Sequence, residues 1–394
     1  MIRKSLLLKL YDSAGMERWN DKMRPVELRE MDKQAHKMVI AYMLAKSEGN
    51  NPDLDWIEII EGGIFDLLQR IVVTDLKPPF FHRIEKDREQ YEQLNRYVIK
   101  ELKDDIAELG NDFFERFQYY LLQPKETINR RILNAAHYYA TSWEFDIIER
   151  ANPNGYEMAE IRKQIEEKSE QYYDLKGIQL LTLYRNLKNF SNLCGELRFQ
   201  IRWSHLHRIP RTSVLGHMLV VAISSYLFSL EIGACPQRCI NNYFTGLFHD
   251  LPEVLTRDII SPVKAQVVGL DKLIKQYEQE EMLKIYAMVP QTWHADLRMY
   301  TENEFEGRVN AGPETKPVSS AEISKQYNKD SYNPRDGEII KAMDELAAFM
   351  EAHLAVQNGM QHPRLKETIT RIKDKYNNTT ICGVSLGAIY KDFS

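Results

Sequence analysis

Apolar residues recur at every third or fourth position along much of this chain, and that spacing is the feature that most restricts its fold. This period places apolar side chains on one face of an α-helix, whereas a half-buried strand requires alternation at every second residue. Alternating patterns are scarce. The helical period is clearest in Lys33–Ser47, Arg130–Ile148, Ser213–Ile232, Pro236–Phe248, Val263–Met288 and Glu338–Val356. The sequence therefore predicts an all-α fold.

Helix boundary signals support this prediction in the second half of the chain. Ser213 precedes an apolar run and can cap a helix, and Gly233 can end that helix. Pro236 lies where the next helix would begin, a position that tolerates proline because its missing N–H would have no partner there.

The chain, with its 394 residues, is too long for one ordinary core and should form two or three units. Asn152–Gly155, with the sequence NPNG, is a strong turn signal, and the charge-rich Tyr156–Tyr173 is expected to be a solvated helix between two units. We place the boundary near residue 170, which gives units 1–170 and 171–394. The polar stretch Thr301–Gly337 is expected to be a long loop or insertion.

Composition limits the possible partners. The formal net charge of −5 argues against a broad footprint on long nucleic acid, but small phosphorylated ligands need only a few local basic residues. Met1–Leu10 lacks a signal-peptide cleavage site, and the most apolar run, Val214–Leu230, is interrupted by polar residues. Four cysteines fit a reducing compartment. We expect a cytoplasmic protein that does not enter a membrane.

The two halves share an order of landmarks, which indicates a duplication; a chance match of short apolar helices is the alternative. Arg18-Trp19, His36, Asp66-Leu67 and His137 in the first half parallel Arg202-Trp203, His217, His249-Asp250 and Asp344 in the second. The offsets are 184 residues for the arginines, 181 for the first histidines, 183 for the dyads and 207 for the last pair. The extra length before Asp344 matches the polar Thr301–Gly337 stretch.

The first half is expected to be a degenerate copy. Leu67 stands where the second half has Asp250, and a leucine cannot bind a metal. Arg70 stands where the second half has Glu253, and an arginine cannot accept a proton from water. His36, Asp66 and His137 leave a residual metal site as one alternative and ordinary core or surface roles as the other.

In the second half, His217, the pair His249-Asp250 and Asp344 lie on three different predicted helices and form a candidate metal site. Imidazole and carboxylate groups suit one divalent transition metal, Co, Mn, Zn, Ni or Fe, and packed helices can direct such groups to one point. Taken singly, each of these residues is ordinary, because a lone histidine on a helix is more often structural.

The sequence around the dyad adds a longer motif. From His249 to Lys264 the chain reads HDxxEVLTxDxxxPVK, and Arg202-Trp203 begins 15 residues before His217. On these residues the chain resembles the HD superfamily and, within it, the bacterial 5′-deoxynucleotidases of the YfbR type. The resemblance covers about residues 195–356 without the Thr301–Gly337 stretch. It departs at Val214–Gly216, where that family usually has polar residues and a glutamate.

The resemblance implies a role for each matching residue. His217, His249, Asp250 and Asp344 would hold the metal, and Glu253 would orient or deprotonate the attacking water. The substrate would be contacted by Arg202 at its phosphate, by Trp203 against the ribose 2′-hydroxyl and by Asp258 near the sugar hydroxyls. Lys264 would add positive charge near the phosphate.

The predicted function is hydrolysis of the 5′-phosphate of deoxyribonucleoside monophosphates. One alternative is an HD hydrolase of another small phosphorylated metabolite, because a fold does not fix a substrate. Another is a nucleotide-binding regulatory protein without turnover. Single-repeat relatives pair two HD domains, so this tandem chain is expected to be either a monomer with an internal pseudo-dimer or a homodimer.

Overall fold

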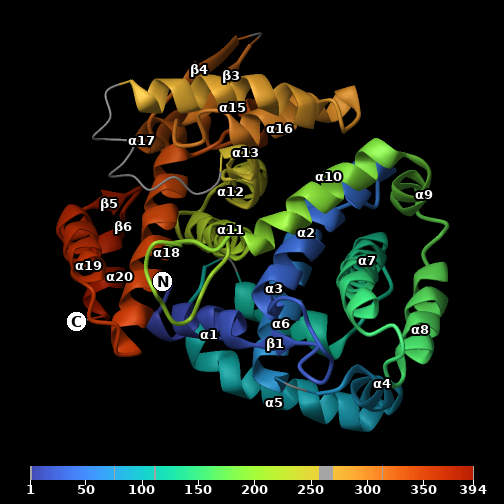
Figure 1. Ribbon diagram of the computed structural model, residues 1–394. Coiled ribbons are helices and arrows are strands. Elements are labelled where there is room, and N and C mark those ends of the chain that lie inside the picture. The colour runs from blue at the N-terminus through green and yellow to red at the C-terminus, as the bar shows by residue number, and fades with distance from the viewer. Residues whose placement is uncertain (1, 75, 111, 257–268, 313, 394) are drawn as a thin grey trace.

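The computed structural model describes residues 2–74, 76–110, 112–256, 269–312 and 314–393, and these residues are mostly helical (Figure 1). The first half begins with α1 (Lys4–Gly15) and a short antiparallel pair, β1 (Glu17–Arg18) and β2 (Leu28–Arg29). Helices follow: α2 (Glu30–Glu48), α3 (Trp56–Val73), α4 (Pro78–Lys86), α5 (Arg88–Ile106), α6 (Phe113–Leu122), α7 (Ile128–Ala151), α8 (Met158–Glu170), α9 (Lys176–Leu183) and α10 (Arg185–Glu196).

The second half has three long helices and several shorter elements. After the 3₁₀ turn η1 (Leu197–Phe199), its helices are α11 (Val214–Glu231), α12 (Pro236–Phe248), α13 (Glu253–Thr256), α15 (Leu270–Tyr286), α16 (His294–Thr301), α17 (Ser320–Glu322), α18 (Gly337–Gln357), α19 (Pro363–Tyr376) and α20 (Leu386–Lys391). Two antiparallel hairpins consist of β3 (Arg308–Ala311) with β4 (Glu314–Pro317), and β5 (Thr380–Ile381) with β6 (Val384–Ser385). Single turns are η2 (Gln291–Trp293), the π-helical η3 (Ile323–Tyr327) and η4 (Asp330–Tyr332).

The predicted helix boundaries are confirmed where they carried signals. The Ser213 side chain accepts a hydrogen bond from the backbone N–H of Gly216 and so caps α11. Gly233 follows that helix with a φ of +62°, a left-handed conformation that glycine adopts without steric cost. Pro236 is the first residue of α12. Short local patterns therefore define both ends of the connection between these two helices.

Thr301–Gly337 was expected to be a long loop or an insertion, and the loop is wrong, because the described residues of this stretch form the β3–β4 hairpin, α17, the π-helical η3 and the 3₁₀ turn η4. The buried guanidinium of Arg335 donates to the carbonyl oxygens of Met299, Glu302, Asn303 and Glu306. These bonds connect the end of α16 and the residues that follow it to Arg335, which lies two residues before the start of α18. A single buried arginine thus orders a stretch whose composition is that of a loop.

Both halves contribute to one continuous apolar core. In the first half, α2 packs against α3 and α7; in the second, α11 packs against α12 and α18; and α2 also packs against α11 (Figure 1). Helix α11 is long and apolar enough to cross a membrane, contrary to the expectation from its polar residues, and 94% of it is buried in the protein. Its apolarity is accounted for by its position as a central core helix.

The backbones of the two halves share local features at matching positions. Glu17 pairs with Arg29 in the first half and Ile201 pairs with Ser213 in the second, and in each case the second partner is followed directly by the central helix. The tryptophans that follow the two arginines share a rare conformation, with φ of +57° at Trp19 and +58° at Trp203. Left-handed backbone is uncommon for a bulky side chain, so its recurrence at matching positions supports a common ancestry of the two halves.

Polar contacts also join the halves. Arg198, which precedes the second half's pairing segment, donates to Glu144 of α7 at 2.8 Å and contacts Nδ1 of His36 at 3.1 Å. Ser213 donates to the buried carboxylate of Asp32 at the start of α2. The first half therefore covers the second along a contact that is both apolar and ionic.

Candidate metal and phosphate site

Three of the predicted metal ligands converge, each from a different helix. His217 lies in the first turn of α11, His249 follows the last residue of α12, and Asp344 lies in the second turn of α18. One ligand atom from each of the three lies within 4.8 Å of the other two. Residues that are up to 127 positions apart are therefore brought to one point because the three helices pack together.

The histidine ring nitrogens are arranged as a metal site requires. Nδ1 of His249 lies 2.8 Å from the carbonyl oxygen of Gly246, and because a carbonyl only accepts, Nδ1 donates to it and Nε2 is the nitrogen that faces the other ligands. That buried Nε2 has no hydrogen-bond partner. Nε2 of His217 lies 3.2 Å from Oδ1 of Asp344. A buried polar atom without a partner is costly, so this donor set fits a bound cation.

The electrostatic field at this point also favours a cation. Burial disfavours the charged imidazole of His249, but Asp250 and Asp344 outweigh burial and raise its pKa to about 9. Burial disfavours the Asp344 carboxylate as well, yet its hydrogen bond with His217 and the charge of Lys341 hold its pKa well below the usual range. Negative charge is thus concentrated beside the two Nε2 atoms.

Asp250 lies beside this group and also contacts Arg202. Its Oδ2 is 3.6 Å from Nε2 of His217 and 3.3 Å from Nε2 of His249. The same oxygen accepts from Nη1 of Arg202 at 3.3 Å. The predicted phosphate-binding arginine therefore lies next to the predicted metal ligands, with a side chain that is 12% exposed.

Glu253 is the first residue of α13, the one-turn helix that directly follows the dyad. The sequence did not predict whether a helical turn continues past Pro252, because proline is tolerated only near the start of such a turn. Pro252 in fact lies immediately before α13, and the N–H of Glu253 donates to the carbonyl of Asp250 at 3.0 Å. A local turn therefore holds the backbone of Glu253 next to that of Asp250.

Several residues at the site were not found from the sequence. Lys341, one turn before Asp344 on α18, donates to that carboxylate at 2.9 Å and lies over the ring of Phe305. Phe305 also packs near the ring of His249. Glu304 is next in the chain, and burial raises the pKa of its carboxyl. Phe305 and Glu304 belong to the segment whose carbonyl oxygens accept hydrogen bonds from Arg335. The stretch that was expected to be a loop therefore forms one wall of the site.

Glu351 is a second missed residue. It is fully buried on α18, two turns after Asp344, and it accepts from Nε1 of Trp203 at 2.7 Å and from the hydroxyl of Thr212 at 2.7 Å. Trp203 packs against the apolar cluster of Ala352, Ala355 and Leu365, which joins the last turns of α18 to α19. The spacing of seven residues from Asp344 could have placed Glu351 on the same helix face, but no motif marks it.

Two predicted substrate contacts, Asp258 and Lys264, lie outside the described residues. Their proposed contacts with sugar and phosphate stay predictions.

The structure corrects the sequence parallel between His36 and His217. Counted from the paired residues that precede the central helices, His217 corresponds to Lys33, because each is the fourth residue of its helix. Nζ of Lys33 lies 2.6 Å from Nδ1 of His137, just as His217 contacts Asp344. His36 lies one turn further along and contacts the carbonyl oxygen of Ser191. The three residues His36, Asp66 and His137 therefore do not form a metal site together.

Ammonium groups fill the equivalent position in the first half. Lys37 forms an ion pair with Asp66, at the dyad position, and Tyr120 donates to the same carboxylate at 2.9 Å. Lys33 and Lys37 are both fully buried, and burial holds the pKa of Lys33 well below its usual value. Arg70 lies 3.5 Å from Glu30. Buried lysine side chains thus contact the groups of the first half that correspond to the predicted metal ligands.

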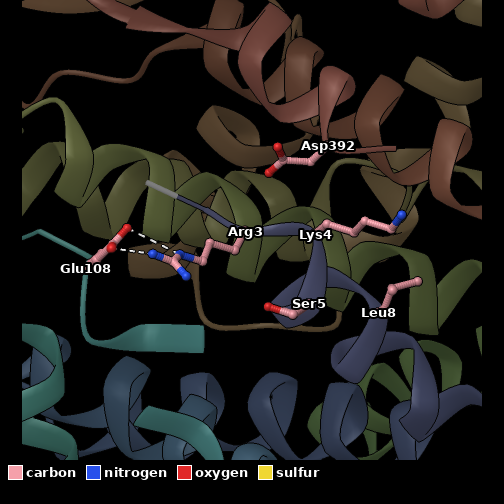
Figure 2. Close-up of a pocket in the computed structure, with 6 residues that line it drawn as sticks. All are labelled: Arg3, Lys4, Ser5, Leu8, Glu108 and Asp392. Atoms are coloured by element: carbon pink, nitrogen blue, oxygen red, sulfur yellow. Dashed lines mark hydrogen bonds and ion pairs between the residues drawn. The ribbon is translucent and has the colours of Figure 1, made fainter. Parts of the chain in front are cut away.

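A separate surface hollow, of about 680 Å³, lies where α1 begins (Figure 2). Arg3 and Glu108 form an ion pair across part of it. It is lined by Arg3, Lys4, Ser5, Leu8, Glu108 and Asp392, none of which belongs to the candidate site.

Comparison with known proteins gives two matches. Residues 194–373 match the HD domain family. A 5′-deoxynucleotidase of Pasteurella multocida (strain Pm70) is 19% identical over 178 residues, which are 44% of this chain and 78% of that protein. The family match falls in the half that carries His217, His249, Asp250 and Asp344, which agrees with the resemblance inferred from the motif.

Proposed function

We propose that this chain, whose residues 194–373 match the HD domain family, is a metal-dependent 5′-nucleotidase that releases phosphate from deoxyribonucleoside 5′-monophosphates. The observation that carries the proposal is the convergence of His217, His249 and Asp344, with Arg202 held by Asp250 at its edge. The name of the Pasteurella protein supports the choice of substrate class.

The proposed reaction transfers the phosphoryl group to water. A bound divalent metal would make water more acidic and polarise a phosphoryl oxygen. The carboxylate of Glu253 takes a proton from the water whose oxygen attacks phosphorus, the bond between phosphorus and the 5′-oxygen breaks, and the departing 5′-oxygen takes up one proton to become the hydroxyl of the nucleoside. Arg202 binds the phosphate oxygens with its planar guanidinium and offsets the charge that grows on them. The products are a nucleoside and inorganic phosphate.

Two carboxylates hold the guanidinium of Arg202 in one orientation. Nη1 bonds to Asp250 at 3.3 Å and Nε contacts Glu351 at 3.4 Å. An arginine fixed on two sides loses little conformational freedom when it binds an anion, which favours binding. Phosphate would therefore be received next to the ligand set.

A phosphate-release screen tests the proposal. The full chain, loaded in turn with Co²⁺, Mn²⁺, Zn²⁺, Ni²⁺ or Fe²⁺, is incubated with deoxyribonucleotides, ribonucleotides and other small phosphate esters. Release from deoxyribonucleoside monophosphates is the expected result. Release only from other esters would point to a different phosphorylated metabolite, and nucleotide binding without release would point to a regulatory protein.

We predict a preference for deoxyribonucleotides over ribonucleotides. Trp203 is fixed by its bond to Glu351 and by packing against the end of α18, so it cannot easily move away from an added 2′-hydroxyl. A steric wall of this kind discriminates by about 10–200-fold. The measurement is the ratio of kcat/KM for dAMP and AMP. Trp203→Ala should reduce that ratio, and equal values for both nucleotides in the wild-type protein would contradict the prediction.

We also predict that the first half takes no part in the chemistry. His137→Ala removes the imidazole that contacts Lys33, which is far from the ligand set along the chain. Phosphate release and metal content should stay within a few-fold of the parent protein. A folded variant that keeps its metal but loses turnover would show that the first half is chemically active.

A further inference from the structure

We propose that Glu351 is a positioning residue that joins the metal ligand His217 to the phosphate-binding Arg202. This inference rests on the proposed function, since it concerns how the same site is held in its working arrangement. Neither the motif nor the family match assigns a role to this carboxylate.

One oxygen of Glu351 faces the metal ligand. Oε1 accepts from the Thr212 hydroxyl at 2.7 Å and lies 3.7 Å from Nδ1 of His217. That distance exceeds a hydrogen bond. On the other side of the ring, Nε2 faces Asp344 at 3.2 Å and Asp250 at 3.6 Å, so a cation bound there requires the proton on Nδ1, where the negative charge of Glu351 stabilises it. Nδ1 of His217 has no hydrogen-bond partner. Glu351 thus biases the imidazole toward the tautomer whose Nε2 is available to a metal, as outer carboxylates commonly do.

The other oxygen faces the substrate side. Oε2 accepts from Nε1 of Trp203 at 2.7 Å and from Nε of Arg202 at 3.4 Å. Because Nη1 of Arg202 bonds to Asp250, the guanidinium is held between two carboxylates. One side chain therefore contacts a metal ligand, the phosphate-binding arginine and the wall of the sugar pocket.

Burial of the Glu351 carboxylate has a free-energy cost. Glu351 is fully buried, and an ionised carboxylate in a protein interior is tolerated only when it is paired and hydrogen-bonded. An apolar residue of similar size at such a position is often neutral or stabilising for the fold. A site that instead keeps the charge, with four polar groups around it, is better explained by orientation of those groups than by stability.

The first half supplies a comparison. Glu144 lies on α7, 207 residues before Glu351, and accepts from Nε1 of Trp19 at 3.0 Å and from Nε of Arg18 at 2.7 Å. Its other oxygen accepts from Arg198. Where the second half has His217, the first half has Lys33. The link between tryptophan, glutamate and arginine therefore belongs to both halves, and only Glu351 adds a contact with a metal-binding imidazole.

The test compares Glu351→Gln with Glu144→Gln in the full chain. Each substitution replaces one buried carboxylate by a neutral isostere that cannot accept from all the same donors, so both should lower the melting temperature. Calorimetric titration of the metal-depleted proteins with Co²⁺ should show about a 10–100-fold loss of affinity for Glu351→Gln, the usual effect of removing an outer carboxylate. Glu144→Gln should keep its Co²⁺ affinity within a few-fold. KM for dAMP should rise in Glu351→Gln alone, because Arg202 loses its second partner.

Wild-type Co²⁺ affinity in Glu351→Gln, or an equal loss in Glu144→Gln, would overturn the proposal. If Glu351→Gln does not fold, Glu351→Asp keeps the buried charge and withdraws it from His217, and it should still bind Co²⁺ more weakly than the parent protein. The Co²⁺ titration does not depend on turnover. Failure of the wild-type protein to hydrolyse any nucleotide would therefore count against the proposed function, whereas the difference between the variants decides the role of Glu351.

Discussion

Replacing His249 and Asp250 together by alanine should empty the metal site and abolish phosphate release. The double substitution removes the buried Nε2, which makes no hydrogen bond, and the carboxylate whose Oδ2 lies within 3.6 Å of both imidazoles. His217 and Asp344 alone would leave two ligands, fewer than the three that catalytic metal sites typically take from the protein. Metal analysis of the purified wild-type chain should find about one divalent ion, and the variant should retain almost none.

The matched control for this experiment lies at the dyad position of the first half. Asp66→Asn removes a carboxylate there but keeps a side chain that can accept a hydrogen bond from Tyr120. Metal content and phosphate release should both be unchanged, because Lys37 already provides positive charge at that position. Circular dichroism should show that both variants are folded. Full metal occupancy in the folded double variant would refute the assignment of the site.

Replacing Glu253 by glutamine should leave the metal in place and reduce turnover by about 10²–10⁴-fold, the usual contribution of a positioned acid or base. Glutamine keeps the shape of the side chain but cannot take up a proton. Since α13 begins at this residue and its N–H is bonded to Asp250, the local backbone should be preserved. The measurements are kcat for dAMP and metal content in the same preparation.

Two further variants test whether the loss of turnover is specific to Glu253. Arg70→Gln changes the corresponding residue of the first half and should leave kcat within a few-fold of the wild-type value. Arg202→Ala should raise KM as well as lower kcat, since it removes a group that binds phosphate in both the ground state and the transition state. Near-normal turnover of Glu253→Gln would mean that another group activates the water.

The helical class and the ends of the central helices were predictable because they depend on short stretches of sequence. Periodicity located α2, α7, α11, α12 and α18, and residues such as Ser213 and Pro236 marked helix starts. The dyad and its motif identified the half of the chain that matches an HD domain. Each of these signals lies within about twenty residues, where local propensity and spacing dominate.

Only the tertiary structure decided which residues of the two halves correspond. Sequence order matched His36 to His217, but the pairing of Glu17 with Arg29 and of Ile201 with Ser213 sets the register and places Lys33 there instead. A search for similar residues in similar order does not detect the shift of three residues between Lys33 and His36. On a helix it moves a side chain to another neighbour, so His36 contacts Ser191 rather than His137.

The surroundings of the site also depended on contacts that are distant in the chain. Arg335 orders Thr301–Gly337 through four carbonyl oxygens, and Glu351 gathers Trp203, Thr212 and Arg202 from a loop almost 150 residues earlier. A buried arginine or glutamate has no periodic or motif signal, because its role is fixed by which polar groups the packed helices leave without partners. The sequence by itself determined the candidate ligands and the helices that carry them, and the packing of those helices decided which side chains meet.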